Sequence, residues 1–384
     1  MKSPVYISSI ASISPLGKDP KEIWNNYKTP VHFISSNNFD DKMALAAFLP
    51  EELKEESIRL RESKTKYKNL DNSVLYAILA SRIAVTAAGW KKGNSIGINI
   101  GSSRGATALF EKYHAEYLRC GKTETATSPA TTLGNISSWV SYDLKSNGPD
   151  ISHSVTCSTG LHAILNGCAW LGAGMADKFL AGGSEAALTP FTIAQMNALR
   201  IYAKEEQEYP CRALDMDKLT DTMVLGEGAG VVCLEKNPEN SLARIAGIGY
   251  ATEKVKHSVS ISANAECLYK SMKMAIGRLP LNEIDIVVMH APGTIKGDLA
   301  ELKAVKNLFG KELPALTSNK WKIGHTFGTS GILSLEMALL MLEREEFIEV
   351  PFSEISRPPK KIRNILVNAV GFGGNAVSIL VNKS

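Results

Sequence analysis

Residues 154–160 read Ser-Val-Thr-Cys-Ser-Thr-Gly, and this stretch decides how the whole chain is interpreted. A short run, 151–156, precedes Cys157, and a segment rich in small residues, 158–172, follows it. The pattern predicts a strand that passes into a helix with the cysteine at the junction. Orphan N–H groups and the positive end of a helix dipole stabilise a thiolate there, and the thiolate is the form that attacks acyl carbonyls.

A lone cysteine is more often a buried structural thiol, but two distant histidines change that balance. His290 opens the sequence His-Ala-Pro-Gly-Thr, and His325 ends the sequence Lys-Trp-Lys-Ile-Gly-His. Each histidine lies in its own glycine-containing loop, so the three residues together predict a Cys-His-His site for acyl transfer. The remaining histidines lack such context and are interpreted as surface or core residues: His32, His114, His153, His162 and His257.

Bulk composition indicates an ordinary globular protein. The chain has 384 residues, 44% of them hydrophobic and 21% charged, enough for two core-bearing domains or one duplicated unit. Its net charge of +4 comes without a basic stripe, which disfavours nucleic acid as a partner. We also expect no metal, because no pair of His or Cys has the usual ligand spacing.

Cysteine usage and the absence of long apolar runs bear on localisation. The six cysteines show no paired spacing, which favours reduced thiols. The N-terminal residues pass directly into a strand-like segment without the features of a signal peptide. No apolar run approaches the roughly 20 residues that span a bilayer. We therefore expect a cytoplasmic protein with no membrane span.

Strand and helix patterns alternate along the chain, which predicts an α/β fold with largely parallel layers. Strands are expected at 5–13, 95–100, 151–156, 179–182, 231–235, 284–289, 364–370 and 377–381. Helices are expected at 51–61, 75–89, 107–118, 158–172, 263–279, 298–309 and 331–343. No linker separates the parts. We expect two halves sharing one core, with the nucleophile in residues 1–245 and both histidines in residues 246–384.

The chain resembles the β-ketoacyl-acyl-carrier-protein synthases, the condensing enzymes of fatty acid and polyketide synthesis, in their elongating type. The motifs that carry the resemblance span nearly the whole length and lie at 12–17, 154–160, 226–230, 290–298, 324–325 and 371–374. It implies a thiolase-like fold of two similar halves in five layers (α-β-α-β-α). It also implies decarboxylative Claisen condensation, a homodimer or a heterodimer with a related subunit, and acyl carrier protein as partner.

The resemblance also implies roles for single residues. Cys157 would take the acyl chain as a thioester, and the backbone N–H groups of Cys157 and Phe372 would form the oxyanion hole. Phe372 would gate the acyl pocket. His290 and His325, as neutral imidazoles of fixed tautomer, would stabilise the enolate left by decarboxylation. Lys320 would hold this network together electrostatically.

Acyl groups would arrive on the phosphopantetheine arm of the carrier protein, held in the entry tunnel by Thr294. The resemblance implies no metal and no soluble cofactor.

Four positions depart from the family pattern. Pro292 replaces one of two pantetheine-binding hydroxyls. After the last glycines, Asn375-Ala376 replaces the usual Thr-Asn. Ser334 replaces an acidic residue, with Glu336 nearby but on a different helical face. Arg104 stands where an apolar residue often lines the acyl chain, so it would shorten the pocket or meet a polar group there. A subunit contact is favoured over a substrate contact for this residue. These departures favour a specialised enzyme, such as a member of an aryl-polyene or polyketide pathway.

Two rival functions remain. A non-catalytic partner subunit that sets chain length would typically lack the nucleophile, which this chain keeps. A coenzyme-A thiolase would need a second reactive cysteine near the C-terminus, and the last cysteine is Cys267. The glycine-rich stretch 226–230 lacks the Lys-Ser/Thr of a phosphate loop, so Glu227 within it is expected to be a structural carboxylate.

Overall fold

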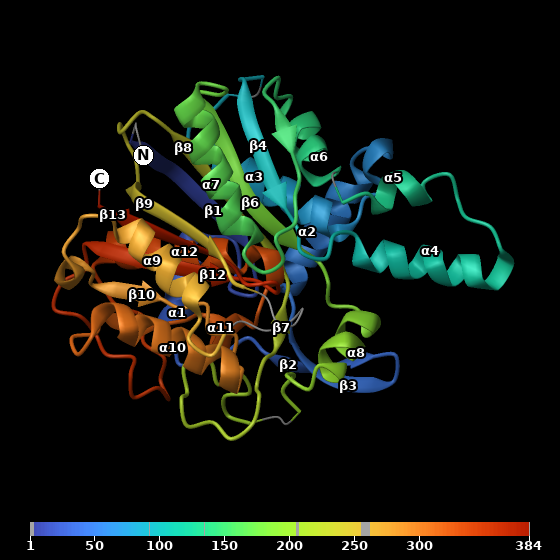
Figure 1. Ribbon diagram of the computed structural model, residues 1–384. Helices are drawn as coiled ribbons and strands as arrows, with labels where there is room; N and C mark the ends of the chain where they lie inside the picture. Colours follow the sequence, from blue (N-terminus) through green and yellow to red (C-terminus); the bar gives the residue numbers. More distant parts are fainter. Residues whose placement is uncertain (1–3, 92, 134, 205–206, 255–261, 384) are drawn as a thin grey trace.

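The computed structural model describes residues 4–91, 93–133, 135–204, 207–254 and 262–383, and ten strands of this part form one mixed sheet (Figure 1). The strand order is β11-β10-β12-β13-β9-β1-β8-β6-β4-β5. Five strands come from the N-terminal half: β1 (Val5–Ile13), β4 (Ile96–Gly101), β5 (Asp150–Ile151), β6 (Lys178–Glu185) and β8 (Gly228–Glu235). Five come from the C-terminal half: β9 (Ala243–Thr252), β10 (Ile286–Val288), β11 (Ala315–Thr317), β12 (Asn364–Val370) and β13 (Asn375–Asn382).

The two halves of the sheet repeat one topology. If the five strands of each half are numbered in chain order, they lie in the order 3-2-4-5-1 from the outer edge of the sheet to its centre, in both halves. The first three strands from the edge are parallel in both, and the last two pairings are antiparallel in both. The halves join where β1 pairs with β9. The chain therefore contains one architectural unit twice, as expected.

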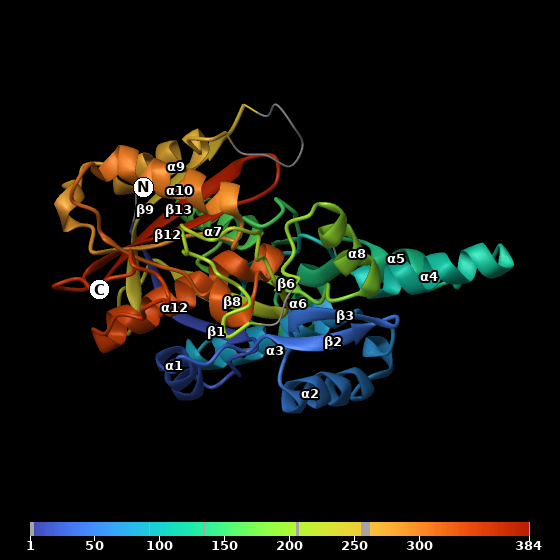
Figure 2. The ribbon, with the colours of Figure 1, turned by 90° about the horizontal axis from the view of Figure 1, so that it is seen from below.

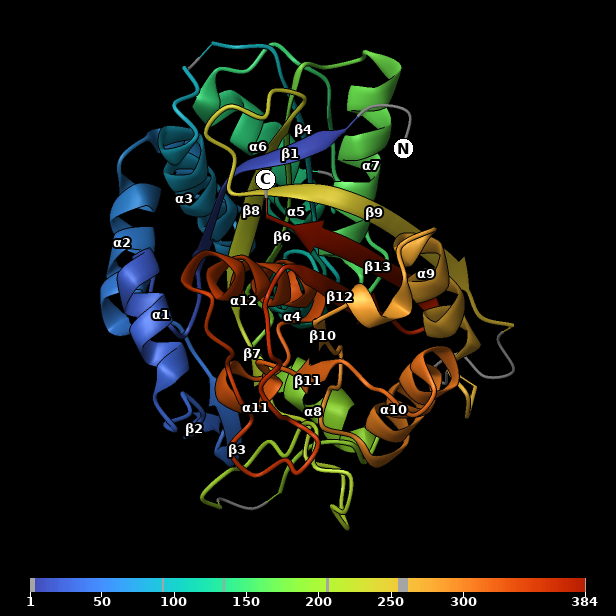
Figure 3. The ribbon, with the colours of Figure 1, turned by 90° about the vertical axis from the view of Figure 1, so that its left-hand side faces the viewer.

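Helices complete five alternating layers (Figure 3). Between the two halves of the sheet lie α7 (Thr159–Ala173) and α12 (Ser330–Arg344), which contact each other and strands of both halves. The outer face of the N-terminal half is covered by α3 (Asn72–Ala87) and α6 (Asn135–Leu144). The outer face of the C-terminal half is covered by α9 (Glu266–Ile276) and α10 (Ile295–Phe309). This is the predicted α-β-α-β-α order.

The two central helices differ in burial, since α12 is buried almost throughout whereas α7 buries one face. Every residue of α12 from Ser330 to Leu342 is buried, as expected for a helix without a polar face. The small residues of α7 permit a close approach, since a Cβ on Gly160 would lie 2.6 Å from Cγ1 of Ile332. This tight packing fixes α7, and with it the segment just before its N-terminus.

The remaining elements surround this core. They are α1 (Pro20–Lys28), β2 (Ser35–Phe39), β3 (Lys42–Ala47), α2 (Glu51–Glu62), η1 (Thr65–Tyr67), α4 (Thr107–Cys120), α5 (Thr127–Thr131), α8 (Pro190–Ala198), β7 (Leu225–Gly226), η2 (Leu281–Glu283), α11 (Lys320–Ile323) and η3 (Phe327–Thr329). Strands β2, β3 and β7 form a small second sheet. Helix α4 extends away from the body of the molecule (Figures 1 and 2).

Two sequence expectations are wrong. The strand expected at 151–156 is a strand only over Asp150–Ile151, because side chains rather than a neighbouring strand hold the rest of that segment. Oγ of Ser152 accepts from the Ser137 N–H at 2.9 Å, and Oγ1 of Thr159 accepts from the Val155 N–H at 2.9 Å. The sequence also predicted no strand between residues 13 and 95, whereas the region before α2 contains the β2–β3 hairpin. The expected division after residue 245 falls inside β9.

Candidate active site

Cys157 lies immediately before the N-cap of α7 and points into an apolar cluster. Ser158 is the N-cap, and Thr156 on the other side has φ of 49°, an unusual conformation for a β-branched residue. The thiol belongs to a buried cluster that also contains Phe327 and, from α8, Ile193 and Met196. A nucleophile in this position is surrounded mainly by apolar side chains.

The resting form of Cys157 differs from the expected thiolate. Burial, and next to it the nearby Glu185 carboxylate, raise the pKa of the Cys157 thiol to about 12. The Arg104 and Lys320 cations and a hydrogen bond from the Phe372 N–H act in the opposite direction without overcoming burial. The thiol is therefore the resting form, and its proton must leave as the acyl group arrives.

Phe372 lies where the oxyanion hole is expected. Its backbone N–H reaches the Cys157 sulfur, and its carbonyl accepts from Oγ1 of Thr156 at 3.3 Å. Such an approach needs a glycine at 371, because a Cβ there would lie 1.7 Å from Oγ1 of Thr156 and 3.0 Å from the Cys157 nitrogen. Phe372 is 36% exposed, in contrast to the buried Cys157 beside it.

The two histidines face each other edge to face. Their ring centroids are 5.1 Å apart at 83°, and the His325 ring lies 5.8 Å from that of Phe327, which shares the apolar cluster of Cys157. Burial, followed by electrostatic repulsion from His325 and Lys320, lowers the pKa of His290 well below its usual value. Burial, followed by repulsion from Lys320, lowers the pKa of His325 to about 3. Both imidazoles are thus neutral. Neither Nδ1 has a hydrogen-bond partner among the described residues, so no bond on that side fixes the tautomer.

Backbone contacts fix both histidine loops. The Glu301 carboxylate of α10 accepts from the His290 N–H at 2.9 Å and from the Ala291 N–H at 2.8 Å. The His325 N–H donates to the Val224 carbonyl at 2.7 Å, and the His325 carbonyl accepts from the Gly226 N–H at 3.1 Å. The first loop is therefore held within the C-terminal half, and the second is held to β7.

Lys320 is buried among neutral partners. Its Nζ donates to Oγ of Ser334 at 3.2 Å and to Oδ1 of Asn319 at 3.3 Å, and burial lowers the pKa of its ammonium to about 8. Ser334, the departure noted in the sequence, thus occupies the place beside this lysine. Glu336 faces elsewhere, as expected from its helical position, and accepts from Oγ of Ser12 at 2.8 Å.

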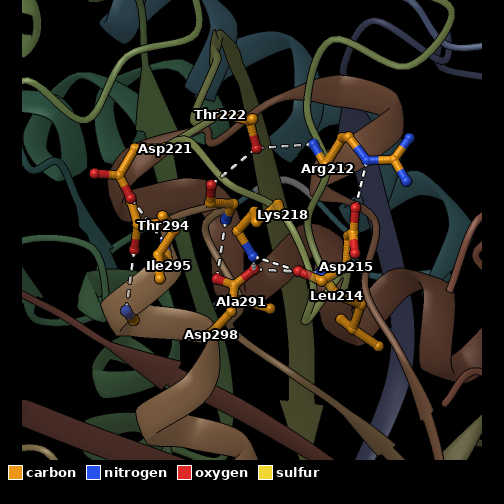
Figure 4. Close-up of polar contacts among 12 residues, drawn as sticks. Arg212, Leu214, Asp215, Lys218, Asp221, Thr222, Ala291, Thr294, Ile295 and Asp298 are labelled. Atoms are coloured by element: carbon orange, nitrogen blue, oxygen red, sulfur yellow. Dashed lines mark hydrogen bonds and ion pairs between the residues drawn. The ribbon is translucent and has the colours of Figure 1, made fainter. Parts of the chain in front are cut away.

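Thr294 is the N-cap of α10, four residues after His290. Its Oγ1 accepts from the Gly297 N–H at 3.2 Å, and it lies beside the loop 210–222 (Figure 4). In the same view Lys218 and Asp298 point toward each other and form a buried ion pair of 2.8 Å. Asp221 accepts from the Ile295 N–H at 2.7 Å. The hydroxyl expected to hold the pantetheine arm therefore belongs to a rigid joint between two loops.

Arg104 lies close to the nucleophile. Its guanidinium is 5.3 Å from the centroid of the Phe327 ring and donates from Nη2 to Oε1 of Gln195 on α8. Its charge lowers the pKa of the Cys157 thiol, against the larger effect of burial.

Sequence reasoning missed the carboxylates that hold the site together. Glu185 and Glu301 were not singled out, although Glu185 ends a buried strand and Glu301 shares the inner face of α10 with Asp298. Glu227 was interpreted as a structural carboxylate, and its Oε1 accepts from the Leu49 N–H at 3.1 Å. Lys322 was also missed: its buried Nζ donates to the carbonyls of Asn26, Thr29 and Val31 at the end of α1, at 2.7, 2.6 and 2.7 Å.

The structure thus brings the buried residues Cys157, His290, His325 and Lys320 together, with the exposed Phe372 and with Arg104 beside the cysteine and Thr294 on the loop of the first histidine. No group of three or more His, Cys, Asp or Glu in the described ranges has the arrangement of a metal site. Within the same ranges, no helix is long and apolar enough to cross a membrane.

Solved structures of similar fold include ketosynthases. The ishigamide ketosynthase/chain length factor superimposes with a TM-score of 0.87 at 19% identity, covering 100% of this chain and 99% of that chain. A ketosynthase solved with its type II polyketide acyl-carrier protein and bound to a hexaketide gives 0.85 at 18% identity, covering all of both chains. These likenesses show the ketosynthase, thiolase-like fold.

Comparison of sequences identifies the family as well as the fold. The chain is 28% identical to 3-oxoacyl-acyl-carrier-protein synthase 2 of Staphylococcus aureus (strain COL) over 99% of this chain and 98% of the relative. It is 30% identical to the synthase 2 of Rhizobium meliloti (strain 1021) over 82% of each. Models of the β-ketoacyl synthase N-terminal and C-terminal domains match residues 2–240 and 242–350. The chain therefore belongs to the β-ketoacyl synthases, the family of condensing enzymes.

Proposed function

We propose that this protein condenses an acyl group held on Cys157 with a malonyl group held on acyl carrier protein. The observation that carries this proposal is the meeting of a buried thiol, bonded by the Phe372 N–H, with two neutral histidines around Phe327. A thiol nucleophile and a pair of uncharged hydrogen-bond donors are the two requirements of the two half-reactions.

The first half-reaction is acyl transfer. The sulfur of Cys157 forms a bond to the thioester carbonyl carbon, and the carrier thiol leaves with the proton that the Cys157 thiol loses. The negative oxygen formed on the way would be bound by the N–H groups of Cys157 and Phe372. Since the thiol pKa is about 12, proton removal is part of this step rather than a prior equilibrium.

The second half-reaction is decarboxylation and condensation. The malonyl thioester carbonyl accepts hydrogen bonds from His290 and His325 while the carbon–carbon bond to carbon dioxide breaks. The resulting enolate attacks the thioester on Cys157 and releases the cysteine thiolate. Neutral imidazoles suit this step, because they donate without leaving a fixed positive charge after the negative charge has moved on. Lys320 supplies the positive potential behind them.

The proposed reaction needs no metal and no soluble cofactor, since the phosphopantetheine arm of the carrier protein carries both substrates. Thr294, at the rim of the loop that begins with His290, is positioned to contact that arm. We place the reaction in the cytoplasm.

We further propose that the working form is a dimer, with a second copy or a related ketosynthase-like subunit. Helix α4 projects from the body and carries exposed apolar side chains: Phe110 is 62% exposed, Tyr117 51% and Leu118 71%. A helix with such side chains needs a partner to cover them.

The test is to incubate the purified protein with malonyl carrier protein and a series of acyl carrier proteins, and to analyse the carrier-bound products by mass spectrometry. The expected product is a 3-oxoacyl carrier protein two carbons longer than the acyl donor, with release of carbon dioxide. Failure with every acyl donor, while the protein forms a stable complex with an active ketosynthase, would favour the non-catalytic partner subunit instead.

A further inference from the structure

Arg104 places a cation against the apolar cluster that surrounds the nucleophile. Its guanidinium lies over the Phe327 ring, 5.3 Å from the centroid, and is bonded to Gln195 on α8. Phe327, Ile193 and Met196 belong to the same apolar cluster as Cys157. An acyl chain bound to Cys157 would extend among these side chains and meet the guanidinium.

Hydrogen bonds from the backbone of its turn to a buried carboxylate fix the position of Arg104. The fully buried Glu185 carboxylate accepts from the Ser103 N–H, from the Arg104 N–H at 3.3 Å and from the Gly328 N–H at 3.0 Å. One side chain therefore fixes both the turn that carries Arg104 and the turn that carries Phe327. The fit is close, because a Cβ on Gly328 would lie 2.7 Å from Oε1 of Glu185.

Two further features of the site are energetically unfavourable, one in the backbone of Phe327 and one in the side chain of Arg104. Phe327 has φ of 43°, which a bulky residue rarely adopts and which the surrounding contacts must enforce. Nε of Arg104 is buried and has no hydrogen-bond partner among the described residues. A buried guanidinium N–H without a partner is costly, so a ligand that supplies an acceptor would be favoured there.

We propose that Arg104 selects acyl chains that carry a keto or hydroxyl oxygen over plain saturated chains of the same length. This inference rests on the proposed function of Cys157 as the acyl acceptor. An oxygen on the chain would accept from Nε, whereas a methylene in its place would cover the guanidinium and leave it unpartnered. The effect is one of discrimination between substrates, not of chemical catalysis.

A role for Arg104 at a subunit contact is the competing explanation. Of the partners of the side chain, Phe327 belongs to the apolar cluster of Cys157, and Gln195 lies on α8, the helix that supplies Ile193 and Met196 to that cluster. These contacts favour the substrate role.

The experiment compares the rate of Cys157 acylation, by intact-protein mass spectrometry, for a saturated acyl carrier protein and for chains of equal length with one keto group at successive positions. We expect the parent protein to prefer at least one keto chain about tenfold or more. Arg104→Met should remove that preference by accelerating loading of the saturated chain. Arg59→Met, at an exposed position of α2, is the matched control and should load like the parent.

The outcomes separate the two proposals. Equal selectivity in the parent and in Arg104→Met, with both loading, would overturn the role of Arg104 alone, and a change of oligomeric state in that variant would assign it to a subunit contact. No loading of any chain on the parent would overturn the proposed function as well. If Arg104→Met does not fold, Gln195→Leu, which frees the guanidinium, should weaken the preference for the keto chain, and an unchanged preference would overturn the inference.

Discussion

Two buried carboxylates hold the two sides of the site, and they differ in what they join. Glu301 accepts from the N–H groups of His290 and Ala291 and from Nδ2 of Asn368, all within the C-terminal half. Glu185 accepts from the turn at Ser103 in the N-terminal half and from Gly328 in the C-terminal half. The His290 loop is therefore shaped within its own half, whereas the nucleophile side depends on a contact between the halves, as does the His325 loop, which is bonded to Val224 and Gly226.

A second contact between the halves supports the same distinction. Lys218, in the loop before β7, pairs with Asp298 on α10, and their side chains are 3% and 0% exposed. A duplicated fold brings a nucleophile and a histidine pair to one place only if such joints hold the halves in register. Some of these residues, such as Glu301, therefore shape one part of the site, whereas others, such as Glu185 and Lys218, fix the position of the two halves of the chain relative to each other.

The largest effect on a single side should come from His290→Ala. Removing one donor to the developing enolate should lower carbon dioxide release from malonyl carrier protein about 100-fold or more, with acylation of Cys157 retained. Carbon dioxide release and intact-protein mass are measured on the same preparation. Equal loss of both reactions would mean that the two sides are not separable.

Lys218→Met should weaken the joint between the halves. It leaves the Asp298 carboxylate buried without its partner, so the free energy of unfolding should fall by about 3–5 kcal/mol. Denaturant unfolding measures this. Lys270→Met, which removes an exposed pair with Glu266 at 2.9 Å, is the control and should change stability little. Equal stability of the two variants would show that the buried pair does not hold the halves.

Glu185→Gln and Glu301→Gln distinguish the two carboxylates directly. Each replaces one acceptor oxygen by a donor that faces backbone N–H groups, at a cost of about 1–3 kcal/mol. Glu301→Gln should slow decarboxylation and spare acylation, whereas Glu185→Gln should slow acylation and the overall condensation. Matching profiles for the two variants would remove the distinction between a local clamp and a clamp between the halves.

The smallest expected effect is that of pH on carbon dioxide release, the reaction assigned to the two histidines. Because burial lowers the pKa of His325 to about 3 and that of His290 well below its usual value, both are neutral from pH 5 to 7, and Lys320, with a pKa of about 8, stays charged. Carbon dioxide release should therefore be flat between pH 5 and 7. A fall of roughly 25-fold between pH 7 and pH 5 would indicate one ordinary histidine with a pKa near 6.5, and a fall of several hundredfold would indicate two.

The sequence predicted the repeated α/β pattern because long apolar segments carry it, and β1 and β12 have the expected bounds. It missed the hairpin at Ser35–Phe39, whose polar residues lack strand periodicity. The candidate residues were visible as motifs. Glu185 and Lys218 were not, because their partners, Gly328 and Asp298, are distant in sequence and meet them only in the folded chain.

The central claim is that Cys157 is the residue that carries the acyl group, and intact-protein mass spectrometry after mixing with acyl carrier proteins tests it most directly. The account predicts a mass gain equal to one acyl group on the parent protein, and none on a folded Cys157→Ala variant measured beside it. Acylation of the alanine variant at the rate of the parent would contradict the account.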